Sequence, residues 1–555
     1  MRWAFLLLGL SIIGCGDDAA PADAGQDAQD AARDSGEDTG VDTGPRDAGT
    51  DTFRVDAGPP VTGCELMTPD AGPDAGGAEP PAPLAGPGGP ARAFTADEIL
   101  TGCASLDGGE RDRDHHNTVL MLDGYLWMPW AHEAGIGGIS VWDFSDPCAP
   151  DPIATVVDEA MRETHAAGIA YLQDRRWMVT TSLTGIMFWD ITDPENIVRV
   201  TDMTLPEVVY PDSYARVVMS TFWQAPYVYV GASDNGVFIV DASNPESPEL
   251  VHQFEPIPDF RVGGVHVIGT MLVVFPSEGS RTQLFDVSDP SDPRPIPGGS
   301  WTLTNGENDR FGRPLIRGAY FAHVNGNRAY YARHLLGGGL IVYDILDPST
   351  PTFLGALEST RSGANGGYVF LKEDEAFLGL SRFGEIIDVR DPTNLSAMSE
   401  LEMTGDLDTM VPVGNVIVAS VDDDAVPGEA SRVYPWKTDV DTRAPVVNMV
   451  VPRDGEERVA LGARVGITFD EHIELQTLHA ETFFVRAIDE EGAPVGDALR
   501  GHFSGQEGVY NFWPSAPLLP DTRYEVVVPA DGVQDWNGNA TATPFQSTFR
   551  TVSCE

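Results

Sequence analysis

The chain has 555 residues, which is too long for one ordinary hydrophobic core, so we expect two or more domains. Its formal net charge is -51, with 85 aspartates and glutamates against 34 lysines and arginines. Nucleic acid and anionic lipid headgroups would repel such a chain. The composition therefore argues against the nucleic-acid-binding classes and predicts no nucleic-acid partner.

The first residues, 1–15, have the pattern of an export signal. Arg2 supplies a positive charge, and Trp3–Ile13 is an apolar run too short to remain as a membrane-spanning helix. The run ends in Ile12-Ile13-Gly14-Cys15, which resembles the lipobox of bacterial lipoproteins. The resemblance implies that Cys15 carries a lipid anchor, whereas the alternative is an ordinary signal peptide with an incidental cysteine. The next residue, Gly16, is not the aspartate that retains such proteins at the inner membrane, so we expect the outer membrane or the cell surface.

Besides Cys15, the chain contains Cys64, Cys103, Cys148 and Cys554. An even number of cysteines in an exported protein suggests disulfides, and four cysteines allow three pairings. We favour Cys103–Cys148, because both residues lie at the edges of the first sequence repeat described below.

Residues 16–92 form a segment rich in Asp, Ala, Gly, Thr and Pro, with runs such as DAGQDAQDAARDSGEDTG. The segment has few aromatic residues and many like charges, so it cannot bury enough surface to fold. We predict a disordered acidic linker that holds the folded part away from the membrane. A calcium site is the less favoured interpretation, because the spacing does not follow an EF-hand loop.

A short phrase recurs between residues 93 and 441. Its copies are WDFSDP at 142–147, WDITDP at 189–194, VDASNP at 240–245, FDVSDP at 285–290, YDILDP at 343–348 and IDVRDP at 387–392. Their first aspartates are 44 to 58 residues apart, a period typical of repeat architectures such as propellers. The best-preserved unit contains four short runs rich in β-branched and aromatic residues, with proline only in the turns. Four strands make one blade of a β-propeller.

Two of these units, GGISVWDFSDPCAP and GGLIVYDILDPSTP, resemble the LVIVD repeat of exported bacterial and archaeal proteins, and the resemblance covers roughly residues 110–440. It implies propeller architecture and no general enzymatic activity. A degraded seventh unit follows the sixth phrase, so we expect an all-β, seven-bladed β-propeller over residues 93–441. Glu98–Leu106 is a candidate outer strand for the last blade, which would close the ring and remove its exposed edges.

Residues 442–555 change in character. Val465–Glu471 alternates like a half-buried strand, and further short strands follow, including Tyr524–Val528 and Ser547–Thr551. The series resembles the bacterial Ig-like domain of surface-layer proteins, which implies a β-sandwich. Asp535–Asn539 resembles a calcium-binding loop, but we interpret it as a turn between strands.

The sequence contains no GxSxG, HExxH, Walker or CxxC motif, so an enzyme is the less favoured class and we expect no cofactor. The recurring aspartates, by contrast, are Asp143, Asp190, Asp241, Asp286, Asp344 and Asp388. A residue that every blade requires is one that holds the blade together. We therefore predict that these carboxylates accept backbone N–H groups in the Asp-Pro turns and have no catalytic role.

Residues that differ between blades are better candidates for a site. In a propeller, the loop that enters the first strand and the loop between the second and third strands lie on one face, which we call the funnel face. Basic or titratable residues in these loops are His116, His132, His165, Arg216, Arg261, Arg317 and His334. They could bind an anionic ligand or an acidic peptide, or the first three could hold a transition metal. Alternatively, they cap strands and pair with neighbouring aspartates.

Together these features predict a lipid-anchored protein of the bacterial cell surface. Its expected role is binding or scaffolding, with the funnel face of the propeller contacting a ligand or a protein partner. One alternative is an exported hydrolase or lyase with its site in the funnel. Another is a structural component of a surface layer, which the Ig-like resemblance suggests.

Overall fold

The computed structural model describes residues 92–106, 118–131, 136–162, 166–209, 215–256, 260–334, 337–422 and 425–554. The expected signal peptide, Cys15 and all but the last residue of the expected acidic linker lie outside these ranges. The regular secondary structure of the described residues consists of β-strands and one short 3-10 helix, η1 (Leu475–Thr477). It contains no helix with the length and apolar character needed to cross a membrane.

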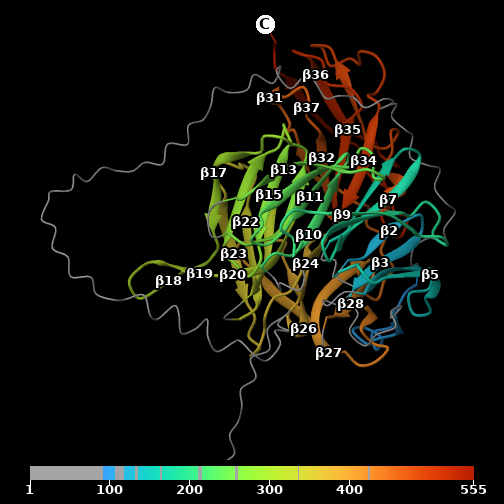
Figure 1. The fold of residues 1–555 in the computed structure, drawn as a ribbon. Coiled ribbons are helices and arrows are strands. Elements are labelled where there is room, and N and C mark those ends of the chain that lie inside the picture. Colours follow the sequence, from blue (N-terminus) through green and yellow to red (C-terminus); the bar gives the residue numbers. More distant parts are fainter. Residues whose placement is uncertain are drawn as a thin grey trace, which may run out of the picture.

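Successive four-stranded antiparallel units form the first five blades of a propeller (Figure 1). Blade 1 is β2 (Leu120–Leu122), β3 (Tyr125–Ala131), β4 (Gly137–Asp143) and β5 (Asp151–Asp158). Blade 2 is β6 (Gly168–Leu172), β7 (Arg175–Ser182), β8 (Gly185–Asp190) and β9 (Val198–Thr204). Blade 3 is β10 (Ser220–Gln224), β11 (Tyr227–Gly231), β12 (Val237–Asp241) and β13 (Glu249–Phe254). Blade 4 is β14 (Val262–Ile268), β15 (Met271–Pro276), β16 (Arg281–Asp286) and β17 (Arg294–Thr302). Blade 5 is β20 (Gly318–Asn325), β21 (Arg328–His334), β22 (Gly339–Asp344) and β23 (Thr352–Glu358).

Blades 6 and 7 share one long strand, β27 (Ser396–Val413). Its first half pairs with β26 and completes blade 6, and its second half pairs with β28 and begins blade 7. The other strands of blade 6 are β24 (Val369–Lys372), β25 (Glu375–Gly379) and β26 (Ser381–Asp388). Those of blade 7 are β28 (Val416–Val421), β29 (Ser431–Pro435) and β1 (Ala104–Ser105).

The ring is closed by its N-terminal segment. β1 pairs with β29 and becomes the outer strand of blade 7, as the sequence predicted for Glu98–Leu106. Next to β1, Cys103 forms a disulfide with Cys148, which follows the Asp-Pro turn of blade 1. This is the pair favoured from the sequence. This disulfide thus joins the closing segment of the last blade to the first blade.

Burial explains the strand sequences. The third strand of a blade, such as β12, is packed on both sides, and its residues Val237–Val240 are fully buried, which requires a continuous apolar run. The outer strand, such as β13, has one face in solvent, and there exposed and half-buried residues are mixed. Hydrophobic contact between neighbouring blades therefore supplies the core of the ring.

The Asp-Pro turn joins the third and fourth strands of a blade. In all six copies the first aspartate accepts the backbone N–H two residues later, at 2.7 to 3.0 Å. The aspartate or asparagine before the proline accepts another N–H in the same way, at 2.9 to 3.2 Å. These bonds confirm that the recurring carboxylates shape the turns.

The C-terminal strands form a two-sheet sandwich of the Ig-like type. One sheet contains β30 (Val447–Val451), β32 (Val465–Phe469), β35 (Val509–Pro514) and β34 (Gly501–Gln506). The other contains β31 (Glu456–Val459), β37 (Phe545–Thr551), β36 (Arg523–Val528) and β33 (Phe484–Ile488). Figure 1 shows this domain in orange and red against one side of the ring. Asp535 and Asn539 bond each other within the segment between β36 and β37, so this segment is a turn, as predicted.

The Ig-like domain docks on the side of the ring opposite the funnel face. We call this side the turn face, because it carries the Asp-Pro turns and the turns between first and second strands. Asn511 of β35 accepts the N–H of Gly269 at 2.9 Å, and Arg453 bonds Asn327. Edge strand β34 even pairs with β6, so one sheet runs from the Ig-like domain through blade 2. The two domains therefore form one packed body.

Candidate functional site

The central channel is entered from the turn face by the hairpin β34–β35. Glu507 and Gly508 form its two-residue turn, and both have positive φ, as a type I′ turn requires. Just before the turn, Gln506 donates to the carbonyl of Thr221 at 2.7 Å and accepts from the N–H of Trp223 at 3.2 Å. These partners belong to the innermost strand of blade 3. The hairpin tip therefore lies among the strands that line the channel.

The funnel face carries the candidate residues predicted from the sequence. His116, His132 and His165 lie outside the described residues, so the metal interpretation of these three stays a prediction. Of the remaining four, Arg216 is exposed. Arg261, at the entrance of blade 4, bonds Asp234 at 3.2 Å.

Arg261 and His334 are brought together by one carboxylate, Glu278. Glu278 lies 3.8 Å from the Arg261 guanidinium and 3.7 Å from Nε2 of the buried His334. The other ring nitrogen, Nδ1, donates to the carbonyl of Gly366 at 2.9 Å. The hydrogen bond from His334 lowers the pKa of Glu278 below its usual value despite burial, and the charge of Arg261 adds to this effect. The result is a small, paired polar cluster between blades 4 and 5.

Arg317 lies elsewhere on the same face and contacts a hairpin that the repeat does not predict. This hairpin, β18 (Thr304–Asn308) and β19 (Pro314–Ile316), is inserted between blades 4 and 5 and projects from the ring (Figure 1). Arg317 lies 3.7 Å from its Glu307. Arg261, Arg317 and His334 thus each lie near a carboxylate of the funnel face.

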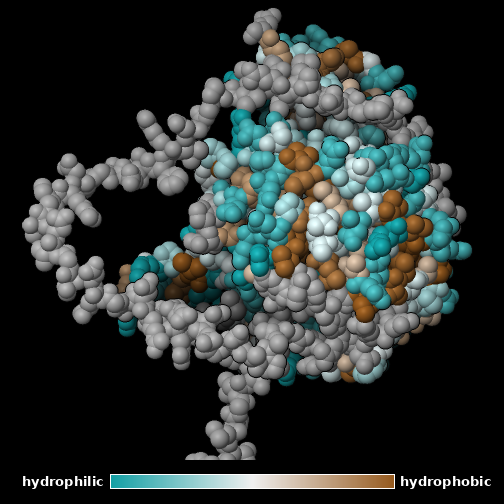
Figure 2. Space-filling model, in the orientation of Figure 1, coloured by the Kyte–Doolittle hydropathy of each residue, from teal (hydrophilic) through white to brown (hydrophobic). Residues whose placement is uncertain are grey.

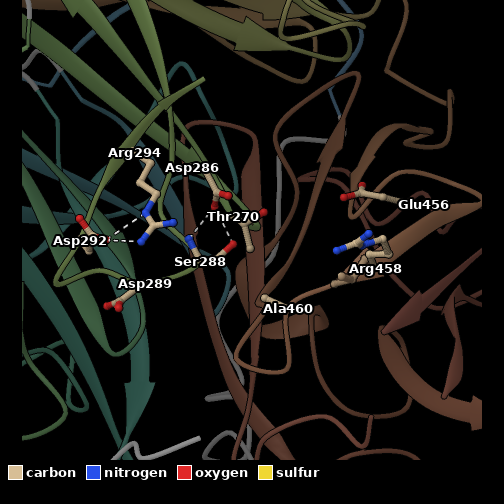
Figure 3. A pocket seen from close by; sticks show the side chains of 10 residues that line it. Thr270, Asp286, Ser288, Asp289, Asp292, Arg294, Glu456, Arg458 and Ala460 are labelled. Carbon is tan, nitrogen blue, oxygen red and sulfur yellow. Dashed lines mark hydrogen bonds and ion pairs between the residues drawn. The ribbon is translucent and has the colours of Figure 1, made fainter. Parts of the chain in front are cut away.

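A pocket of about 200 Å³ lies between blade 4 and the Ig-like domain (Figure 3). Its carboxylates include Asp286, Asp289 and Asp292 on the blade and Glu456 across the gap. The first two already accept backbone N–H groups of their own turn, and Asp292 pairs with Arg294 at 2.6 Å. These bonds hold the three aspartates in place at the junction between the domains.

Two buried polar groups at the domain junction were missed from the sequence. In the first, Lys372 of blade 6 contacts Glu471 and, at 2.7 Å, Asp441. Burial alone would lower the pKa of Lys372, but the two carboxylates outweigh it and raise the pKa above its usual value. This lysine is therefore a charged anchor for the Ig-like domain. The second group contains His266 and His323. A comparison of the repeats could have revealed these residues, since no other described blade has a histidine at the equivalent position of its first strand.

The family comparisons agree with this architecture. A model of the bacterial Ig-like domain matches residues 441–551, and a model of the LVIVD repeat matches residues 225–255 and 322–358. The chain therefore contains LVIVD repeats, which lie in its β-propeller, and a C-terminal bacterial Ig-like domain. The two repeat matches fall on blades 3 and 5.

No curated protein matches the sequence. Among solved structures, a periplasmic gluconolactonase of Pseudomonas aeruginosa is 12% identical, with 51% of this chain and 84% of that chain covered and a TM-score of 0.41. BamB from Moraxella catarrhalis is 13% identical, with 62% and 94% covered and a TM-score of 0.36. The propeller assignment of the LVIVD-repeat protein rests on its own strand pairing.

Proposed function

We propose that this protein is a lipid-anchored binding or scaffolding protein of the bacterial cell envelope, and that its contact surface is the funnel face. The observation that carries the proposal is the position of the Ig-like domain. It covers the turn face, with bonds from Asn511 and Arg453 to the turns of blades 4 and 5. A partner of the propeller would therefore meet the funnel face, where loops vary between blades.

The projecting hairpin β18–β19 supports a protein partner. Phe311 at its tip is 67% exposed and Ile316 is 60% exposed, and brown side chains are visible on this hairpin in Figure 2. The guanidinium groups of Arg310 and Arg313 lie 4.7 and 5.3 Å from the Phe311 ring. Exposed aromatic rings with arginines are enriched in protein interfaces and at their hot spots. The partner would offer an apolar recess rimmed by acidic groups.

A membrane anchor at Cys15 forms the other half of the proposal. Its support is the sequence pattern at the N-terminus, where a short apolar run ends at this cysteine. Cys15→Ser should release the protein from washed membranes into the soluble fraction. A variant that stays membrane-bound would contradict the anchor and leave the contact surface unaffected.

The contact surface can be tested in cells with a photo-crosslinking amino acid. Placed at Phe311, it should give a discrete adduct with an envelope component. The control is Leu346, which is 56% exposed but lies in an Asp-Pro turn on the turn face. No adduct at Phe311, or the same adduct at both positions, would contradict the proposal.

A further inference from the structure

Equivalent positions in the seven blades can be compared through the register of the first two strands. At the third residue pair counted from their turn, the innermost strands carry Leu120, Ala170, Phe222, His266, His323, Phe370 and Val411. Five blades have an apolar residue there. Blades 4 and 5, which are neighbours, have histidine. The repeat therefore does not dictate these two histidines.

Both histidines are buried in an aromatic environment. Each is 3% exposed, and their ring centroids are 5.4 Å apart. The rings of Phe222 and Phe275 lie 5.4 Å from His266, and Phe370 lies 6.3 Å from His323. Within the described residues, Nδ1 of His266 and Nε2 of His323 have no hydrogen-bond partner. Buried polar atoms of this kind cost free energy unless something satisfies them.

The hairpin of the Ig-like domain brings a carboxylate to the same place. Glu507 at its tip lies 3.1 Å from Nε2 of His266 through one carboxylate oxygen. One ligand atom from each of His266, His323 and Glu507 lies within 4.8 Å of the other two. The positive φ of Glu507 and Gly508 forms the tight turn that presents this carboxylate at the tip. Three separate parts of the chain thus meet at one point.

We propose that His266, His323 and Glu507 bind one transition-metal ion, best matched by Zn²⁺, which fastens the Ig-like hairpin to blades 4 and 5. Two imidazoles and one carboxylate are a ligand set that zinc uses, with a water molecule completing a tetrahedral site. Tetrahedral zinc sets such ligand atoms about 3.3 Å apart. The Glu507–His266 pair, at 3.1 Å, already matches this spacing, and a side-chain movement of at most about 1.5 Å brings His323 to it. This proposal departs from the sequence predictions, which expected no cofactor and considered a transition metal only at His116, His132 and His165.

A simple ion pair does not account for this cluster. It would join His266 to Glu507, which lie 3.1 Å apart, and leave Nε2 of His323 without a hydrogen-bond partner. A metal ion held by both rings and the carboxylate would engage all three groups.

The first test is metal content and affinity. The full chain, purified without chelator, should contain one zinc per molecule, and after chelation it should take up one Co²⁺ with the visible absorption of a tetrahedral site. Excess Ca²⁺ should not displace the Co²⁺, because calcium prefers oxygen ligands. This control also separates the site from loose cation binding by the acidic chain.

The second test uses variants that keep the core filled. His266→Phe and His323→Phe copy the residues of blades 3 and 6, so they should fold, and each should lower the Co²⁺ affinity at least 100-fold. Glu507→Gln should weaken it at least 10-fold. His502→Phe, a buried histidine of the same hairpin outside the site, should bind as the original protein does.

Three results would overturn the proposal. One is that the folded protein binds none of Zn²⁺, Co²⁺, Ni²⁺ or Cu²⁺ stoichiometrically. Another is that the double variant of His266 and His323 retains the tight site. The third is that Zn²⁺ raises the melting temperature of the original protein and of this double variant equally, because the ion would then act elsewhere.

Discussion

A guanidinium nitrogen of Arg464, in the Ig-like domain, donates a 2.6 Å hydrogen bond to the backbone carbonyl of Val287 in blade 4. The same side chain is 1% exposed and also bonds Gln224 at 2.8 Å and Tyr229 at 3.2 Å. One arginine of the C-terminal domain therefore ties together blades 3 and 4. The planar fork of arginine is needed to reach several acceptors in different directions.

Arg464→Ala should lower the free energy of unfolding by about 2–4 kcal/mol, because it leaves buried acceptors without donors. Arg464→Lys should recover less than half of this loss, since an ammonium group cannot reproduce the fork. Chemical denaturation would measure both. Equal stability of the lysine variant and the original protein would show that only the charge matters.

Close backbone contact at the junction leads to a second prediction. A Cβ at Gly466 would lie 2.2 Å from the backbone nitrogen of Gly269, so no side chain fits between β32 and the turn of blade 4. Gly466→Ala should destabilise the protein by about 1–3 kcal/mol through this clash. Gly462→Ala is the matched control, because its Cβ would meet only one atom, the carbonyl oxygen of Ser288 at 4.0 Å. If limited proteolysis shows the two variants equally resistant, the docking is looser than described.

Closure of the ring leads to a third prediction. The disulfide between Cys103 and Cys148 spans 45 residues, and a loop of this length should stabilise the fold by about 4 kcal/mol. Replacing both cysteines with serine should lower the free energy of unfolding by about this amount and expose β1 to proteases. Addition of reductant should likewise lower the stability of the original protein, because it breaks this disulfide. An unchanged midpoint of denaturation would contradict the role given to this bond.

The fourth prediction concerns pH. Burial raises the pKa of Glu474, beside η1, to about 8, and the charges of Asp123 and Asp535 contribute to the rise. Below pH 4.5 this carboxyl is protonated in both the folded and the unfolded chain. Between pH 4.5 and 8 only the unfolded chain ionises, so the folded state loses stability as the pH rises.

Glu474→Gln removes this ionisation. The variant should therefore gain stability over the original protein as the pH rises from 4.5 to 8, by up to about 4–5 kcal/mol. Denaturation curves taken across this range would measure the difference. If the free energies of unfolding of the two proteins changed with pH in parallel, this would contradict a protonated Glu474 in the folded state.

Much of the fold could be predicted because its information is local. Each Asp-Pro turn is specified by carboxylates that bond N–H groups two residues away, so a six-residue phrase is enough to mark a blade. The docking of the two domains could not be predicted in this way. It depends on Gly269, Gly466 and Asn511, which are far apart in the sequence and carry no local pattern.

The candidate site could likewise be predicted only in part from the sequence. Loop positions for Arg261 and His334 follow from the order of strands, and the structure joins these two residues through Glu278. The sequence could not show that Glu278 neutralises them, because it lies in a third loop. His266 and His323 were not predicted as site residues, because they lie inside strands. Equivalent strand positions can be compared between blades only when the exact pairing register is known.

The covalent bond beside β1 also determines how the ring responds to mechanical force. A pull on the chain from its N-terminal side reaches Cys103 before it reaches β1, whose ladder to β29 consists of only two residue pairs. The disulfide transmits this force to Cys148 in blade 1. The two residue pairs between β1 and β29 are therefore not pulled apart one after the other from the N-terminal end. A ring whose closing strand is among its shortest can thus bear tension that its hydrogen bonds alone would not resist.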